Sequence, residues 1–161
     1  MLKPNDIDFI YLIKRGVMKI YWANSIFSTA DRYFNELCVK TLRENGYVVL
    51  NPQENIFNQG AVECIANEVF SKDTKMIQEC DIFIACIDQE TIDCGVACEL
   101  GIAWTLNKKL LGLYTDFRQF RKGEGKMYKN PYITGCIKSR GVIVTNINDL
   151  LKELKHVGKS K

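Results

Sequence analysis

The run CDIFIACI, residues 80–87, most narrows the folds open to this chain, because it contains one charged residue, Asp81, and is otherwise apolar. A strand with one face in water alternates apolar and polar side chains, whereas this run offers no polar face. Such strands belong to parallel sheets that lie between two layers of helices. The run therefore predicts a central strand of an α/β protein.

Strand-like and helix-like patterns alternate along the rest of the chain. Short β-rich runs predict the remaining strands, at 18–23, 47–52, 108–114 and 141–145. Apolar residues spaced three and four apart predict helices, at 28–46, in a segment that ends near 79, at 95–106 and at 147–157. Residues 115–140, rich in glycine and lysine, are predicted to form a long loop, which in a compact domain is usually functional or disordered.

Alternating strands and helices are joined by right-handed crossovers, which place helices on both faces of a parallel sheet. The predicted fold class is α/β, a three-layer sandwich around a five-stranded parallel sheet with the flavodoxin-like order 2-1-3-4-5. A length of 161 residues suits a single domain over residues 1–161. We expect residues 1–17 to form an N-terminal arm and the lysine-rich residues 152–161 to form a solvated, partly frayed tail.

Composition excludes several classes of function. The chain has no run of about 18 apolar residues and no signal peptide pattern, so we expect no membrane partner. The net charge of +3 comes from scattered lysines and arginines without a basic stripe, so we expect no nucleic acid partner. There is no C-x-x-C pair and the single histidine is His156, so no metal site is expected.

The cysteines indicate a reducing compartment. The chain has seven cysteines, an odd number, and we interpret them as reduced, small apolar fillers of a cytoplasmic protein. Six of them fall within elements predicted to pack in the core: Cys38, Cys64, Cys80, Cys86, Cys94 and Cys98.

The usual motifs for phosphate binding and for a serine nucleophile are missing. No G-x-G-x-x-G follows the first strand and no G-x-x-x-x-G-K-[ST] occurs, so no cofactor is expected. No G-x-S-x-G elbow occurs either. Carboxylates are the groups that remain for chemistry at the carboxyl edge of the sheet.

Three carboxylates lie in segments that converge at that edge. Asp93 and Glu99 are six residues apart across a loop-to-helix junction, and Asp73 lies eight residues before Asp81. Two carboxylates of unequal pKa can cleave a glycosidic bond, one at the anomeric carbon and one at the leaving group. The residues alone also allow a structural explanation, in which an aspartate caps a helix and a buried glutamate is held by backbone amides.

Four stretches, KIYWANSIFS, SKDTKMIQECDIFIACI, DCGVACELGIAW and YKNPYITG, together resemble the nucleoside 2-deoxyribosyltransferase family. The resemblance extends from about Met18 to about Gly141, and its most specific part is the D-x-G-x-x-x-E-L-G element at 93–101. It implies an enzyme of nucleoside salvage that moves 2-deoxyribose from a 2'-deoxynucleoside to a free nucleobase. It also implies a covalent ester between the sugar and a glutamate, with retention of configuration.

The resemblance implies the roles of the catalytic residues. Glu99 matches the nucleophile, and Asp73 matches the aspartate that protonates the departing base. Tyr21 matches a tyrosine whose hydroxyl orients the nucleophile, and we expect it to keep Glu99 ionised. We expect the pKa of Asp73 to be raised, because a general acid must carry its proton when the donor binds.

The resemblance also implies substrate-binding residues. Asp93 matches an aspartate that holds the sugar hydroxyl, and Phe27 matches an aromatic wall of the base site. Asn130 matches an asparagine that a neighbouring subunit supplies to the 5'-hydroxyl, which implies a homo-oligomer that is at least a dimer. As a pattern alone, Asn130 followed by Pro131 is equally typical of a turn. Trp22 could either pave the base site or pack beneath the sheet, and we favour packing, because a lone aromatic there is more often in the core; we expect Trp104 to serve packing only.

Two other functions stay open. An N-glycosidase on the same fold would use water in place of the acceptor base, and a module that only binds nucleotides would need no nucleophile. The rim of the first strand offers serines but no nearby lysine, which favours an unphosphorylated nucleoside. The sequence does not rank purine against pyrimidine donors.

Overall fold

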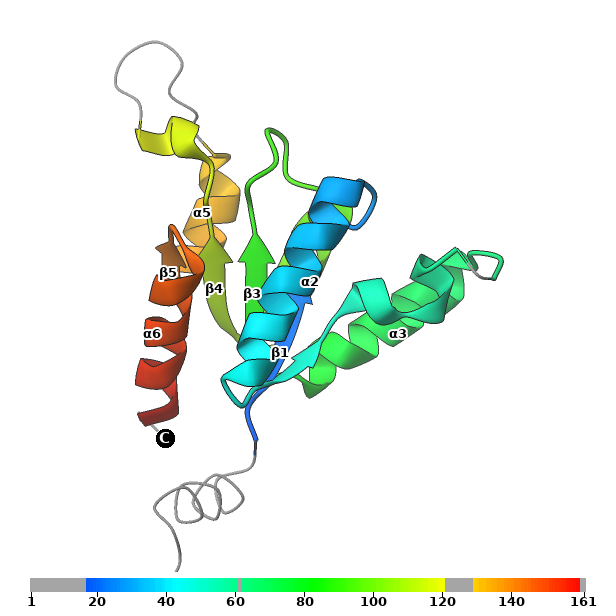
Figure 1. Ribbon diagram of the computed structural model, residues 1–161, viewed down its shortest axis with the longest axis horizontal. Helices are drawn as coiled ribbons and strands as arrows, with labels where there is room; N and C mark the ends of the chain where they lie inside the picture. The colour runs from blue at the N-terminus through cyan, green and yellow to red at the C-terminus, as the bar shows by residue number, and fades with distance from the viewer. Residues whose placement is uncertain (1–16, 61, 121–128, 160–161) are drawn as a thin grey trace, which may run out of the picture.

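The computed structural model describes residues 17–60, 62–120 and 129–159, and these residues contain a five-stranded parallel sheet. The strands follow the order β2-β1-β3-β4-β5, which confirms the predicted flavodoxin-like topology (Figure 1). They are β1 (Lys19–Ala23), β2 (Val48–Leu50), β3 (Ile82–Cys86), β4 (Lys109–Leu113) and β5 (Gly141–Val144). The run CDIFIACI supplies β3, which is buried over its whole length.

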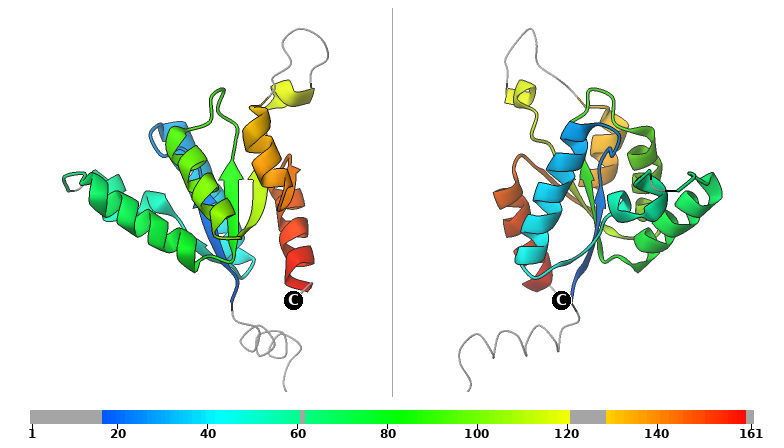
Figure 2. Two further views of the ribbon diagram at one scale, coloured as in Figure 1. Left: turned by 180° about the vertical axis from the view of Figure 1, so that it is seen from behind. Right: turned by 45° about the vertical axis from the view of Figure 1, so that its right-hand side comes forward.

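Helices cover both faces of the sheet, as a parallel sheet requires. The helices α2 (Thr29–Glu44) and α6 (Ile147–Lys159) lie on the face turned toward the viewer in Figure 1. The opposite face, seen from behind in Figure 2, carries α3 (Ala66–Glu79), α4 (Cys94–Thr105) and α5 (Pro131–Lys138), with α4 between the other two. Among the described residues, no helix is long and apolar enough to cross a membrane.

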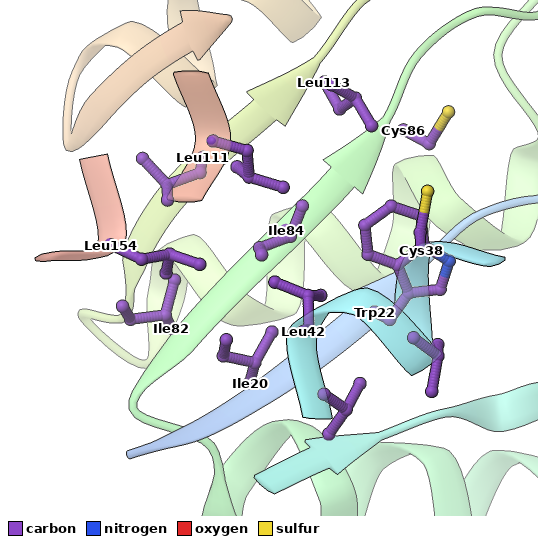
Figure 3. Packing of buried hydrophobic residues seen from close by; sticks show 13 residues of the cluster. Ile20, Trp22, Cys38, Leu42, Ile82, Ile84, Cys86, Leu111, Leu113 and Leu154 are labelled. Carbon is purple, nitrogen blue, oxygen red and sulfur yellow. The ribbon is translucent and has the colours of Figure 1, made fainter. Parts of the chain in front are cut away.

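Alternation along the strands divides the core into two layers. Ile20 and Trp22 of β1 face α2 and α6 together with Ile84 of β3, as Figure 3 shows. Trp22 is 1% exposed, which confirms that it packs in the core. Tyr21 lies between these two residues in sequence and therefore points to the opposite face, toward α3 and α4. The strand period thus places a tyrosine hydroxyl beneath the helix that carries Glu99.

The ends of α2 agree with the sequence pattern. Ser28 caps its start, because the Ser28 hydroxyl accepts a hydrogen bond from the Asp31 amide at 3.0 Å. Past its end, Gly46 takes a φ of 87°, in the left-handed region that glycine occupies without strain. These signals place the helix between β1 and β2 and fix the loop that leaves β1.

The predicted loop over residues 115–140 is wrong in two places. Residues Phe117–Phe120 form a short 3-10 helix, and Pro131–Lys138 form α5, whereas residues 121–128 lie outside the described part. Asn130 caps α5 through its side chain, and Pro131 occupies the first turn, where its missing amide hydrogen costs nothing. The pair that resembled a turn is therefore the start of a helix.

The predictions for the N-terminal arm and for the lysine-rich tail differ in outcome. Residues 1–16 of the predicted arm lie outside the described residues. The lysine-rich tail is not a separate frayed end, because α6 continues through it to Lys159. Within that helix Lys152 pairs with Asp149 at 2.7 Å, so α6 gains one exposed ion pair.

The prediction that six cysteines fill the core is correct for only half of them. Cys38, Cys80 and Cys86 are buried, and burial raises the pKa of each of these thiols. Cys64, Cys94 and Cys98 are exposed. The two cysteines of α4 sit on the side of the helix that the sheet does not cover, which the apolar pattern of α4 concealed.

Candidate active site

A hydrogen bond between Tyr21 and Glu99 forms the centre of the site. Tyr21 lies in the middle of β1, and its ring stacks on Phe83 of β3 with centroids 5.1 Å apart and an angle of 11° between the rings. Its hydroxyl donates to Glu99 Oε1 at 2.8 Å, across 78 residues of sequence. Stacking fixes the ring, so the hydroxyl is held in place to orient one carboxylate oxygen.

Burial and the hydrogen bond from Tyr21 act on the pKa of Glu99 in opposite directions. Burial raises the pKa of Glu99 to about 8, and the negative charges of Asp73 and Asp93 act in the same direction. The hydrogen bond from Tyr21 lowers this pKa but does not offset the burial. The expectation that Tyr21 keeps Glu99 ionised stays a prediction. The pKa of Tyr21 is raised far above its usual range by burial and by Glu99, so its hydroxyl remains a donor.

Asp73 projects from α3 and is 8% exposed. Burial raises the pKa of Asp73, as predicted, while a hydrogen bond from Asn55 and the charge of Lys72 partly oppose the shift. The Asn55 amide donates to Asp73 Oδ1 at 3.3 Å. Asn55 caps a short 3-10 helix, Ile56–Asn58, in a segment that sequence reasoning left as a loop. Asparagine is common in turns, and this residue type was the only sign in the sequence that Asn55 has a local structural role.

Asp93 caps a helix, which is the structural role that the sequence pattern alone allowed for an aspartate here. It caps α4, because its Oδ1 accepts a hydrogen bond from the Val96 amide at 3.1 Å. Gly95 makes room for this cap, since a Cβ at that position would lie 3.0 Å from the same oxygen. Within the described residues, Oδ2 makes no hydrogen bond, so one oxygen of Asp93 is open to a ligand while the other holds the helix.

Asn130 and Phe27 lie in other segments of the chain. Asn130 accepts a hydrogen bond from the Tyr132 amide at 2.9 Å and lines a cavity of about 200 Å³ with the loop between β3 and α4. Phe27, in the loop after β1, is 80% exposed. No hydrogen bond or ion pair in the described ranges joins either residue to Glu99. The hydrogen-bond and electrostatic partners of Glu99 are thus Tyr21, Asp73 and Asp93, and the roles of Asn130 and Phe27 stay predictions.

Sequence reasoning missed a network of amide side chains at the carboxyl edge of the sheet. Asn35 of α2 is fully buried, and its Oδ1 accepts hydrogen bonds from Trp22 Nε1 and from Asn24 Nδ2, both at 2.8 Å. Its Nδ2 donates to the carbonyl of Ser25 and to Gln53 Oε1, both at 2.9 Å. One saturated amide thus holds the loop that leaves β1. The signal in the sequence was Asn35 itself, a polar residue on the apolar face of the helix predicted at 28–46.

A basic residue of α2 also reaches this rim. Arg32 of α2 donates through Nη1 to the carbonyls of Ile26 and Asn58, at 3.1 and 3.3 Å. It ties the loop after β1 to the loop before α3. Because a guanidinium carries five donors, these two bonds leave further donors on Arg32.

The outer side of α4 carries a groove of about 850 Å³ that it shares with α5. Trp104 lines it and is 44% exposed, so the prediction that this residue only packs is wrong. Its Nε1 donates to Ser139 Oγ at 3.0 Å, and Arg140 lies over its ring, 5.0 Å from the centroid. The groove is therefore a surface feature with a tryptophan fixed in its wall.

The site holds no candidate metal centre. In the described part of the chain, no group of three or more histidine, cysteine or acidic side chains could ligate an ion. The chemistry available to the site comes from three carboxyl groups and a phenol, arranged between β1, α3 and α4.

Comparisons with known proteins identify the family of this chain. The sequence profile of the family described as nucleoside 2-deoxyribosyltransferase matches residues 20–152. A conserved protein from Enterococcus faecalis V583 is 31% identical with a TM-score of 0.78, over 88% of this chain and 99% of that one. A comparison with curated proteins gives no match.

Two further solved structures are similar. A 2-deoxyribosyltransferase from Bacillus psychrosaccharolyticus is 28% identical with a TM-score of 0.65, over 82% of this chain and 89% of that one. A CMP N-glycosidase from Clostridium botulinum shares the fold at 21% identity, with a TM-score of 0.58 over 85% of this chain and 98% of that one. Because the family profile covers most of the chain and its central element carries the described carboxylates, the chain belongs to the nucleoside 2-deoxyribosyltransferase family.

Proposed function

We propose that this protein transfers 2-deoxyribose from a 2'-deoxynucleoside to a free nucleobase through a covalent ester on Glu99. The observation that carries the proposal is the 2.8 Å hydrogen bond from the Tyr21 hydroxyl to Glu99, inside a cluster that includes Asp73 and Asp93. A carboxylate that is poorly solvated and oriented by one donor is suited to nucleophilic attack. Family membership supports the same reading.

In the first half-reaction, Glu99 attacks C1' of the donor. A bond forms between a Glu99 oxygen and C1', while the bond from C1' to the base nitrogen breaks and its electron pair leaves with the base. Asp73 gives its proton to the base, because an anionic purine or pyrimidine leaves slowly. The transition state resembles an oxocarbenium ion, which nearby carboxylate charge stabilises.

The protons must be distributed correctly for this step. Attack needs an ionised Glu99 and a protonated Asp73, and burial raises the pKa of both groups. The charge of Asp73 adds to the rise in the pKa of Glu99, so a proton on Asp73 favours the ionised form of Glu99. The reactive form is the one in which Asp73 holds that proton, and the Tyr21 hydrogen bond favours it by stabilising the charge on Glu99.

In the second half-reaction, a free base attacks C1' of the ester from the face that the first base left. The ester bond breaks and returns its electron pair to Glu99, while Asp73, now ionised, takes the proton of the incoming base nitrogen. Two inversions at C1' give overall retention of configuration. The enzyme is then restored, and no cofactor enters the cycle.

Substrate contacts complete the proposal. The open oxygen of Asp93 is placed to accept a hydrogen bond from a sugar hydroxyl, and Phe27 would wall the base. Asn130 would reach the 5'-hydroxyl of a substrate in a neighbouring subunit, which makes the active form at least a dimer. Tyr132, 86% exposed beside Asn130, offers an aromatic contact for such a neighbour.

A matrix of donors and acceptors tests the proposal. Each 2'-deoxynucleoside is incubated with and without a second free base, and both released base and new nucleoside are quantified. We expect new nucleoside in the presence of the acceptor, and none from Glu99→Gln. Glu153→Gln, an exchange of the same type on α6, is the matched control and should keep full activity.

The same matrix decides the alternatives. Base release that does not depend on the acceptor would identify an N-glycosidase, in which water attacks the ester. A protein that binds deoxynucleosides but releases no base from any of them would be a binding module. A Glu99→Gln variant with wild-type transfer rates would contradict the covalent mechanism.

A further inference from the structure

The half-buried side chain of Lys129 joins two segments at the carboxyl edge of the sheet. Its ammonium group donates to the backbone carbonyls of Asp88 and Gln89, at 3.1 and 2.5 Å. It also lies over the ring of Tyr114, 4.7 Å from the centroid. An ammonium has three donors and forms a favourable contact with an aromatic face, so this environment satisfies it closely.

The two carbonyls open the loop that ends at Asp93. The side chain of Asp88 is held from the other side, because its Oδ2 accepts from Thr115 Oγ1 at 2.6 Å and its Oδ1 from the Asp116 amide at 3.1 Å. The side chain of Gln89 donates to Asn24 Oδ1 at 2.7 Å. With Lys129 in place, both residues are fixed through backbone and side chain, and only three residues separate them from Asp93.

On its own segment, Lys129 directly precedes Asn130, the residue that caps α5. Both line the 200 Å³ cavity together with Glu90, Thr91 and Ile92 of the loop. One lysine therefore links the two segments that carry the proposed sugar contacts, Asp93 and Asn130. The link runs through backbone carbonyls and does not depend on the side chains of the loop.

Burial of this cation is costly. Desolvation lowers the pKa of Lys129, while the charges of Asp88 and Asp116 act to raise it and that of Arg118 acts to lower it. A neutral residue would incur no such cost, but it could not supply two donors and a cation for the Tyr114 ring together. A buried cation with specific partners fixes a geometry more than it adds stability.

We propose that Lys129 is a positioning residue that clasps the loop bearing Asp93 to the segment bearing Asn130, and thereby fixes Asp93 at the 2-deoxyribose end of this chain's own site. This inference rests on the proposed function for the identity of the ligand. The clasp itself rests on the hydrogen bonds of Lys129.

Steady-state kinetics of Lys129→Met test the positioning role. Methionine keeps the apolar stem but removes the donors, and loss of hydrogen bonds to a charged group should raise KM for the deoxynucleoside by about tenfold or more. Uniform weakening of sugar binding leaves kcat within about threefold. Lys129→Arg, which can donate to both carbonyls and stack on Tyr114, should restore most of the affinity. Lys152→Met, on exposed α6, is the matched control and should behave as wild type.

Any other kinetic pattern overturns the proposal: an unchanged KM in Lys129→Met, a loss confined to kcat, or no recovery in Lys129→Arg. If Lys129→Met is too unstable to assay, Lys129→Gln keeps a neutral amide donor but not the charge and should give an intermediate KM. Hydrogen exchange of the unliganded protein separates this proposal from the proposed function. Lys129→Met should speed exchange of the amides of residues 90–93 by about tenfold, and unchanged exchange refutes the clasp even if every deoxynucleoside proves inert.

Discussion

Replacement of Tyr21 by phenylalanine isolates the contribution of one hydroxyl group. The ring keeps its stacking on Phe83 at 5.1 Å, while the donor 2.8 Å from Glu99 Oε1 is lost. A hydrogen bond to a charged group is worth about 1.5–3 kcal/mol. Since the charge on Glu99 is needed for attack, the rate of ester formation should fall by about 10- to 150-fold.

The pH dependence of the variant gives a second, independent test. The Tyr21 hydrogen bond lowers the pKa of Glu99, which burial holds at about 8. Without the bond this pKa rises further, so the acid limb of the profile for base release must move to higher pH. Single-turnover base release is measured by rapid quench from pH 6 to 10, about two pH units either side of the pKa of Glu99. The measurement gives both the rate constant and the position of the acid limb.

Tyr33→Phe is the matched control, because Tyr33 is 70% exposed on α2. It should leave the rate and the pH profile unchanged. The reasoning is refuted if Tyr21→Phe matches wild type in both measurements, or if its acid limb moves to lower pH.

Three further predictions follow from the same cluster. Asp73→Asn should slow base release from ordinary deoxynucleosides far more than from 7-methyl-2'-deoxyguanosine, whose cationic base leaves without protonation; equal losses in rapid-quench assays would contradict the acid role. Gly95→Ala should raise KM for the donor without lowering the melting temperature, because its Cβ would crowd Asp93 Oδ1 at 3.0 Å while alanine favours the helix by about 1 kcal/mol. Burial raises the pKa of Glu99 to about 8, so its contribution to stability is present at low pH and lost as pH rises through that value. Glu99→Gln should therefore match wild type in melting temperature near pH 5 and exceed it near pH 9, and calorimetry that shows no such divergence would refute the assigned shift.

The sheet was predictable because its strands carry strong local signals. The run that forms β3 has no polar face, and β1 alternates so that Tyr21 and Trp22 must point to opposite layers. Helix α5 was missed because it is short and begins with a proline. Its place depends on tertiary packing: a Cβ at Gly112 of β4 would lie 3.2 Å from Ile137 Cδ1, so the glycine lets α5 approach the sheet. No local pattern contains that contact.

The site was predictable in part for a similar reason. The resemblance to a family paired Tyr21 with Glu99, and the structure forms that bond. The raised pKa of Glu99 was not foreseen, because it depends on how deeply α4 packs over β1. Asn55 and Lys129 were missed, since each acts through a partner in a distant segment that no local pattern identifies.

The ester on Glu99 is the central claim, and peptide mapping by mass spectrometry tests it most directly. The protein is mixed with a 2'-deoxynucleoside without acceptor, quenched in acid within the first turnover, digested and mapped. The account predicts a deoxyribosyl adduct on the peptide that contains Glu99, lost when an acceptor base is added and absent from Glu99→Gln. Turnover without any adduct, or an adduct on another residue, would contradict it.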